Sequence, residues 1–359
     1  MLTPSRLRLA RHRRGVTRER LSKLTSITTR SLLAYENGTQ RPSSDSLERL
    51  ASALDMPIEF LLGGDVDEIP VESISFRALS KITAGKRDMA RSAGRIAVML
   101  AQWIDQRQAL PTPDVPSLAD VAPEVAAETL SSQWKLPVDG TSNMINVLEA
   151  HGVHVFCVAM DCREVDAYSF VWNELPFVFL NTTKTAERTR FDAAHELGHL
   201  VLHDAARHVR GPQAEREADR FAGALLMPRT SVLASGLRNA SAQHIIATRG
   251  QWQVSAMALA HRLHELSLLT EWGYRAVCVD LARLGYRDGE PGGITPEHSS
   301  TIMEALQTTR PDTSLLTEAA ADLHLTVEEL EKYVRGILPA SATTHRRTPP
   351  RRPTLTLLP

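Results

Sequence analysis

The segment from Phe191 to His203 places the strongest constraint on the fold, because it contains the motif His-Glu-x-x-His at His195, Glu196 and His199. On an α-helix, residues four apart lie one turn apart, so both imidazoles point from the same face. This spacing lets two ring nitrogens bind one zinc ion at about 2.0–2.1 Å. Glu196 lies beside them and is suited to take a proton from zinc-bound water. The segment therefore predicts a metal-binding helix with Zn²⁺ as cofactor and Glu196 as catalytic base.

A catalytic zinc site also needs a third protein ligand and one open position for water. Residues 215–228 form a predicted helix on which Glu215 and Asp219 share one face. Glu215 is the candidate third ligand, and Asp219 is the candidate acceptor for the free ring N–H of a ligand histidine. Glu217 points about 200° away from Glu215 on the helical wheel and is a poorer ligand candidate.

Two further side chains have less certain roles. His203 shares the face of His195 and His199 but lies about 12 Å beyond His195 along the helix axis, so we exclude it as a ligand to the same zinc ion. Binding of substrate, binding of a carboxylate and a structural role stay open for His203, and the structural role is the simplest interpretation. Tyr168 is a candidate for polarising a substrate carbonyl, but nothing in the sequence determines its position.

The first fifty residues carry an excess of positive charge, although the whole chain has a net charge of −1. They hold eleven Lys or Arg against four Asp or Glu, a local charge of +7. A small positive domain on a nearly neutral chain favours a polyanionic partner. Turn and capping residues divide residues 5–62 into short helices, with Thr17 and Thr28 as N-caps, Gly38 as a left-handed end, and Leu21 and Leu24 as buried positions.

This N-terminal stretch resembles the helix-turn-helix domain of XRE/Cro-type repressors. Gly15-Val16-Thr17, Tyr35-Glu36-Asn37-Gly38, Arg41-Pro42 and Phe60-Leu61-Leu62-Gly63 carry the resemblance. It implies that the helix from Thr28 to Glu36 enters the major groove of double-stranded DNA. The residues implied to bind DNA are Arg18, Thr28, Thr29, Arg30, Ala34 and Arg41.

Two departures from the family pattern alter this expectation. Arg18 stands where the family has Gln, which changes the contacts of the second helix, and Ser26 stands where the turn has Gly, which strains the turn. The alternative interpretation is a small helical bundle for dimerisation whose basic residues are merely solvated.

Downstream of this domain the periodicity predicts helices, then strands, then the metal-binding helix. Residues 86–107, 119–133 and the stretch from about Thr141 have apolar residues at helical spacing, whereas 153–158, 167–171 and 176–180 read as strands. Residues 229–275, 295–306 and 314–338 are again helical. Two of these regions resemble a helix-turn-helix weakly, and we expect them to pack on the core instead.

The metal motif and its surroundings resemble the ImmA/IrrE family of zinc metallopeptidases. The resemblance covers about 75–290 and rests on Arg190-Phe191, the His195–His199 motif, His203, and Glu215-x-x-Ala218-Asp219-x-Phe221-Ala222 with Leu225-Leu226-Met227-Pro228. It implies that His195, His199 and Glu215 are zinc ligands and that Glu196 is the catalytic base.

Together these observations predict a mainly α fold with a small β-sheet. The expected parts are an all-α helix-turn-helix domain (1–64), a connector and helical region (65–140), an α+β zincin-like metallopeptidase domain with trailing helices (141–290), a C-terminal helical region (291–338) and a disordered basic tail (339–359). No apolar run is long enough to span a membrane, and the three cysteines form no C-x-x-C pair, so we expect a cytoplasmic protein with no membrane partner.

The predicted function is that of a DNA-binding transcription regulator carrying a zinc-dependent endopeptidase domain. The family resemblance implies a protein substrate, a repressor-type partner, in a stress or mobile-element response. Two alternatives stay open: a regulator whose peptidase-like domain only senses a ligand or partner, and an antitoxin-like repressor. A homodimer is expected because such DNA-binding domains read two half-sites.

Overall fold

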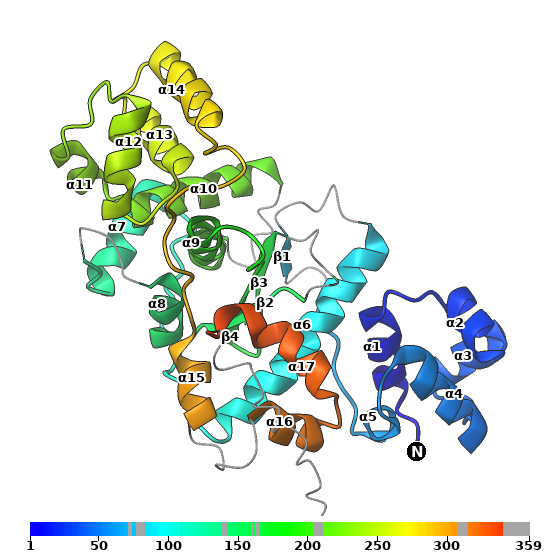
Figure 1. Cartoon of the computed structure of the whole chain (residues 1–359). Helices are drawn as coiled ribbons and strands as arrows, with labels where there is room; N and C mark the ends of the chain where they lie inside the picture. The colour runs from blue at the N-terminus through cyan, green and yellow to red at the C-terminus, as the bar shows by residue number, and fades with distance from the viewer. Residues whose placement is uncertain are drawn as a thin grey trace, which may run out of the picture.

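The protein has a small N-terminal unit and a larger unit built around a β-sheet, as the computed structural model shows (Figure 1). The structure describes residues 1–70, 74–76, 83–108, 110–137, 143–159, 161, 166–203, 211–307 and 315–339. The predicted fold class, mainly α with a small β-sheet, is confirmed. In these ranges no helix has both the length and the apolar character needed to cross a membrane. The predicted tail, apart from Pro339, lies outside the described residues.

The N-terminal unit consists of five short helices. Their bounds are α1 (Pro4–Arg13), α2 (Arg18–Thr25), α3 (Thr29–Glu36), α4 (Ser44–Leu54) and α5 (Ile58–Leu62). Side-chain oxygens of Thr17, Thr28 and Ser43 accept hydrogen bonds from backbone N–H groups in the first turns of α2, α3 and α4. Side chains that point between the helices are fully buried: Leu7, Leu21, Leu32, Leu50, Leu54 and Phe60.

The turn between α2 and α3 has a left-handed residue at Ser26, where the sequence predicts strain. Ser26 adopts a left-handed φ of 56°, which a glycine would adopt with less strain. The expectation that Leu24 is buried is wrong, since its side chain is 49% exposed. Thr25, which follows Leu21 by four residues, takes the inward position instead and is buried.

The larger unit contains a four-stranded sheet with the order β1-β3-β4-β2. The strands are β1 (Ile74–Phe76), β2 (His154–Cys157), β3 (Ala167–Trp172) and β4 (Leu175–Leu180). β3 and β4 form an antiparallel hairpin whose turn residues, Asn173 and Glu174, both have positive φ. β2 is parallel to β4, and β1 is antiparallel to β3. The sequence predicts three of these strands but does not reveal β1, because three residues are too few to show alternation.

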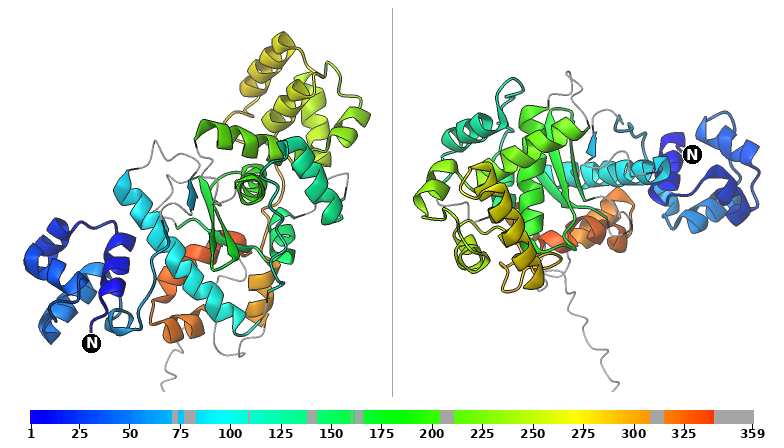
Figure 2. Two further views of the ribbon diagram at one scale, coloured as in Figure 1. Left: turned by 180° about the vertical axis from the view of Figure 1, so that it is seen from behind. Right: turned by 90° about the horizontal axis from the view of Figure 1, so that it is seen from above.

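Two helices cover opposite faces of the sheet, α6 (Ala84–Asp105) and α9 (Ala186–Leu202) (Figure 2). Successive side chains of a strand point to opposite faces, and β3 follows this rule. Tyr168 donates a hydrogen bond of 3.1 Å from its hydroxyl to the carbonyl of Ala90 on α6. Ser169, the next residue, reaches Glu196 on α9. The alternation of β3 therefore gives α9 a polar neighbour from the sheet.

The remaining helices surround this core. α7 (Pro123–Gln133), α8 (Met144–Ala150) and α10 (Pro212–Leu226) pack on α9. A group of four helices lies at the end of the molecule far from the N-terminal unit (Figure 1): α11 (Arg229–Ala234), α12 (Ala242–Thr248), α13 (Ala256–Glu265) and α14 (Glu271–Arg283). Finally, α15 (Ser300–Gln307) packs on α8, whereas α16 (Leu315–Leu323) and α17 (Val327–Val334) pack on α6.

The N-terminal unit joins the larger unit through α1, which packs on α6. Arg13 at the end of α1 is fully buried, and its Nε donates hydrogen bonds to Oε1 of Glu329 at 2.6 Å and to the hydroxyl of Tyr333 at 3.0 Å. Arg14 donates from Nη1 to the other oxygen of Glu329 at 2.7 Å. Residues more than three hundred positions apart in the sequence therefore form one buried ion cluster between α1 and α17.

Candidate metal centre

Helix α9 carries the predicted metal motif and is anchored at its start by Thr185, whose side chain accepts a hydrogen bond from the backbone N–H of Arg188. His195 and Glu196 are fully buried and His199 is nearly so. A sheet on one side and α7, α8 and α10 on the others enclose this helix. The motif therefore lies in the interior of the larger unit and not on its surface.

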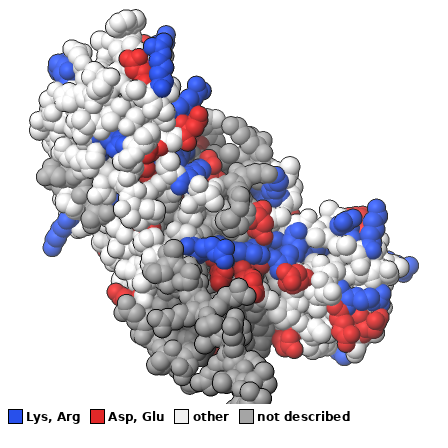
Figure 3. Space-filling view, viewed as in Figure 1, with Lys and Arg blue, Asp and Glu red and all other residues white. Residues whose placement is uncertain are grey.

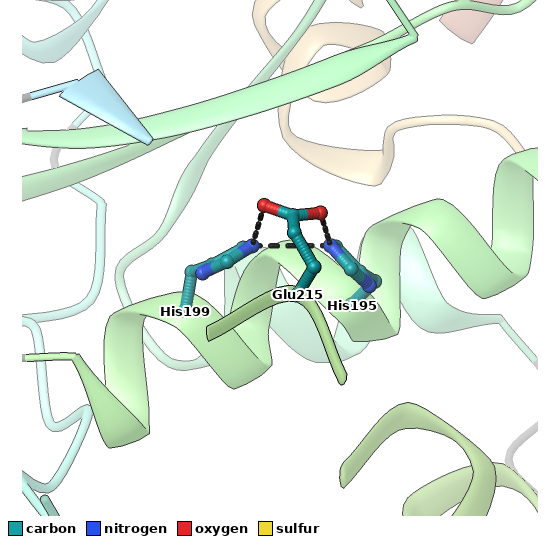
Figure 4. A group of neighbouring side chains, drawn as sticks. All are labelled: His195, His199 and Glu215. Carbon is teal, nitrogen blue, oxygen red and sulfur yellow. Dashed lines mark hydrogen bonds and ion pairs between the residues drawn. The ribbon is translucent and has the colours of Figure 1, made fainter. Parts of the chain in front are cut away.

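The structure brings the three predicted ligands together at the interface of α9 and α10 (Figure 4). The Nε2 atoms of His195 and His199 are 3.1 Å apart. The carboxylate of Glu215 points between the two imidazoles: its Oε2 lies 3.5 Å from Nε2 of His195, and its Oε1 lies 3.5 Å from Nε2 of His199. One ligand atom from each of the three residues lies within 4.8 Å of the others.

Two observations show that these residues fit a catalytic zinc ion. Two ligands at about 2.05 Å from a tetrahedral zinc ion are about 3.3 Å apart, close to the separation of the two imidazole nitrogens. Two nitrogens and one carboxylate oxygen are also a known donor set of catalytic zinc sites, which keep the fourth position open for water. Beside the cluster, Oε1 of Glu196 is buried and has no hydrogen-bond partner among the described residues. A buried acceptor of this kind suits a proton on a zinc-bound water.

The charge states of the ligands also suit a cation. Burial lowers the pKa of His199 to about 4, which keeps its imidazole neutral and its lone pair available. Partial burial opposes the ionisation of Glu215, but hydrogen bonds with His195 and His199 outweigh it and lower the pKa of Glu215 to about 2. At neutral pH the cluster therefore offers the neutral imidazole of His199 and one carboxylate anion.

Glu196 has a different environment from Glu215. Burial raises its pKa to about 7, although His195 and a hydrogen bond from Ser169 lower it in part. The hydroxyl of Ser169 donates to Oε2 at 2.7 Å, which leaves Oε1 as the free oxygen. A pKa near neutrality is what a general base requires. Sequence reasoning does not find Ser169, because only the packing of β3 on α9 places it there.

The outer nitrogens of both candidate ligand histidines contact side chains from α10 and from the residue that follows α9. Nδ1 of His195 lies 2.8 Å from Oδ1 of Asp219, the placement that the sequence predicts. Nδ1 of His199 lies 2.9 Å from Nδ1 of His203, whose Nε2 lies 3.1 Å from Oε2 of Glu217. His203 is therefore outside the ligand cluster and contacts a ligand histidine. Glu217 therefore belongs to this chain of contacts as the partner of His203, which its position on the helical wheel does not predict.

The close approach of α9 and α10 depends on Gly198. A Cβ atom at this position would lie 3.0 Å from Cδ1 of Phe221 and 3.2 Å from Cα of Ala218. Because the second contact is with backbone, a larger residue would push α10, and Glu215 with it, away from the histidines. Tyr168 does not face the cluster. Its hydroxyl is directed to α6 on the other face of the sheet.

The side chains predicted to contact DNA lie on α2, on α3 and beyond it. Thr28, Thr29, Arg30 and Arg41 are exposed, and Ala34 is half-buried. Arg18 is partly exposed, but its Nε donates a hydrogen bond of 2.7 Å to Oε2 of Glu36, a buried carboxylate that also binds Arg11. In the view of Figure 3, Lys and Arg are scattered over the N-terminal unit, and a group of Asp and Glu lies near its lower edge.

Comparison with known families agrees with this division of the chain. Residues 5–59 match the helix-turn-helix domain, and residues 148–264 match the IrrE N-terminal-like domain, a peptidase family. No curated protein is similar enough to the chain to count as a match. The chain thus joins a DNA-binding type of domain to a peptidase-like domain, and the second match includes both histidines, Glu196 and Glu215.

Proposed function

We propose that this protein is a transcription regulator that binds double-stranded DNA through its N-terminal unit and cleaves a repressor-type protein with a zinc-dependent endopeptidase site. The observation that carries the proposal is the arrangement of Glu196 beside His195, His199 and Glu215. A site that only stabilised the fold would have closed coordination and no use for a buried carboxylate with a free oxygen.

In this mechanism His195, His199 and Glu215 would hold Zn²⁺, which when bound supplies a Lewis acid and lowers the pKa of a bound water. Glu196 accepts the water proton on Oε1 and can pass it to the leaving amine. Ser169 holds Oε2, which leaves Oε1 as the oxygen free to take the proton. Asp219 and His203 hold the outer nitrogens of the two histidines and thereby set the direction of their Nε2 atoms.

In the N-terminal unit, α3 is the helix proposed to enter the major groove. Thr29 and Arg30 at its start and Ala34 one turn later are available for base edges, while Thr28 and Arg41 are placed for the backbone. Arg18 has a fixed position because Glu36 holds it, so its proposed contact is with a phosphate close to α2. Symmetrical operators would bring two copies of the chain together.

The test compares wild type with Glu196→Gln on candidate repressors, which are incubated with each protein and analysed for fragments. The variant keeps the ligands, so both proteins should contain equal zinc, and cleavage should fall by about 10²–10⁴-fold, the usual contribution of a general base. Metal analysis of each preparation is the control. If neither protein cleaves and both retain the same effect on transcription, the peptidase function is wrong.

That last result would support the second candidate, a regulator whose peptidase-like domain senses a ligand or partner without cleavage. The buried cluster of Arg13, Arg14 and Glu329 favours this candidate, because it joins the DNA-binding unit to the larger unit and can transmit a change between them. Transcription from the operator, measured for wild type and Glu196→Gln, separates the two functions.

A further inference from the structure

A cavity of about 440 Å³ lies where the N-terminal unit meets the larger unit, away from the metal centre. Its walls come from α1, from the chain just after α5, from α6 and from the end of α16. Three arginines line it: Arg6 on α1, Arg95 on α6, and Arg107 just after the end of α6. Its volume is in the range of pockets that hold small organic molecules.

Arg95 is the most informative of these side chains because it is buried and poorly satisfied. It is only 9% exposed, and its Nε donates to the carbonyl of Asp67 at 2.9 Å. Its Nη1 atom is buried and has no hydrogen-bond partner among the described residues. Its guanidinium also lies over the ring of Trp172, 5.5 Å from the centroid, but no carboxylate among the described residues forms an ion pair with it. Buried cations in proteins normally contact a counter-ion.

Arg6 lies on the other side of the junction and has hydrogen bonding similar to that of Arg95. Its Nε donates to the carbonyl of Gly64 at 2.7 Å, and within the described chain its buried Nη1 likewise lacks a partner. Burial lowers the pKa of both Arg6 and Arg95, and the charge of Arg6 lowers that of Arg95 further, while nearby carboxylates offset this in part. Two like charges therefore line one cavity, and no carboxylate among the described residues forms an ion pair with either, while their unpaired Nη1 atoms lie buried behind its wall.

The two acids of the cavity bind other groups. Asp322 accepts hydrogen bonds from Nε1 of Trp103 at 2.9 Å and from Nη2 of Arg107 at 2.8 Å. Asp65 accepts from the hydroxyl of Ser5 and from the backbone N–H of Val66. Neither acid forms an ion pair with Arg6 or Arg95 in the part of the chain that the structure describes. The charges of Arg6 and Arg95 at this cavity are therefore available to an anionic ligand.

We propose that this cavity binds a small organic phosphate of nucleotide size, which contacts Arg6 and Arg95 together. A carboxylate is planar and pairs best with the fork of one guanidinium, whereas a phosphate presents oxygens in several directions and can accept from two separate arginines. Met99 and Leu323 give the cavity an apolar side for the rest of the molecule. Because Arg6 belongs to the DNA-binding unit and Arg95 to the larger unit, the ligand stabilises their present arrangement.

The test uses the full-length protein and adenosine monophosphate as probe, titrated by calorimetry. Wild type should bind the probe, inorganic phosphate should compete with it, and succinate, a dicarboxylate, should not. Arg95→Gln should weaken binding at least tenfold. Arg87→Gln, on the same helix but outside the cavity, is the matched control and should bind as wild type does.

Three results would overturn the proposal: no binding of the probe by wild type, equal weakening by both variants, or binding of succinate in preference to phosphate. Circular dichroism and a melting curve show whether Arg95→Gln folds. If that variant does not fold, Arg6→Gln decides the matter, since it removes the second cation from a half-buried position. Loss of probe binding in Arg6→Gln supports the site, and unchanged binding rejects it.

Discussion

The hydroxyl of Ser169 donates a 2.7 Å hydrogen bond to Oε2 of Glu196, and Oε1 of the same carboxylate is buried without a partner among the described residues. One strand residue thus distinguishes the two oxygens of the proposed general base. It leaves the second oxygen free to accept a proton.

Ser169→Ala should therefore impair cleavage without removing the metal. The carboxylate would lose the hydrogen bond that β3 donates to it, and a buried acceptor left unpaired costs about 1–3 kcal/mol. We expect about a tenfold fall in the cleavage rate, with zinc content equal to that of wild type. Unchanged cleavage at full zinc occupancy would show that Ser169 does not position Glu196.

The outer contacts of the ligand histidines predict an effect on metal affinity. Asp219→Asn and His203→Ala should each weaken zinc binding by about 10–100-fold, the usual consequence of losing a group that orients a ligand. Competition with a chelator of known affinity measures this. His261→Ala is the control, because this histidine is exposed and lies on α13. Equal affinities in all four proteins would contradict the assigned roles.

The cluster at the junction of the two units predicts how stability depends on pH. Burial opposes the ionisation of Glu329, yet Arg13, Lys332 and Arg14 lower its pKa to about 2 from an ordinary value of 4.5. Since the folded-state pKa is below the unfolded value, the stabilisation is fully present above pH 4.5 and is lost as the pH falls toward 2. Its size is on the order of 3 kcal/mol.

Glu329→Gln should accordingly lower the free energy of unfolding at pH 7 by an amount of this order, and the difference from wild type should shrink as the pH falls from 5 to 2. Urea denaturation at several pH values measures it. Glu331→Gln is the matched control, since Glu331 on α17 pairs with the exposed Arg335, the residue that follows this helix. That pair should contribute about 1 kcal/mol or less. A pH-independent difference for Glu329→Gln would refute the assignment.

The N-terminal unit predicts a separate result for DNA. Arg30→Ala should weaken operator binding by about 1–3 kcal/mol, because Arg30 is exposed at the start of the helix proposed to read the major groove. Lys23→Ala, on the exposed side of α2, is the control and should have a smaller effect. A footprint and an affinity unchanged by Arg30→Ala would exclude α3 as the reading helix.

Local spacing in the sequence is sufficient for the features that depend on one helix or one turn. The face shared by His195 and His199 follows from 3.6 residues per turn, and the caps at Thr17 and Thr28 follow from their position before an apolar run. The same spacing does not reveal that Leu24 is exposed, because burial depends on which neighbour reaches that face. It also does not reveal β1, because β3, the strand that pairs with it, lies almost a hundred residues away in the sequence.

The sequence by itself therefore determined the metal motif, the candidate third ligand and the division into a DNA-binding unit and a peptidase-like unit. Only the tertiary structure decided that Ser169 contacts Glu196, that His203 and Glu217 extend from His199, and that Arg13 meets Glu329. The physical reason is that helix periodicity is set by the local backbone. Contacts between distant residues depend instead on how completed helices and strands pack against one another.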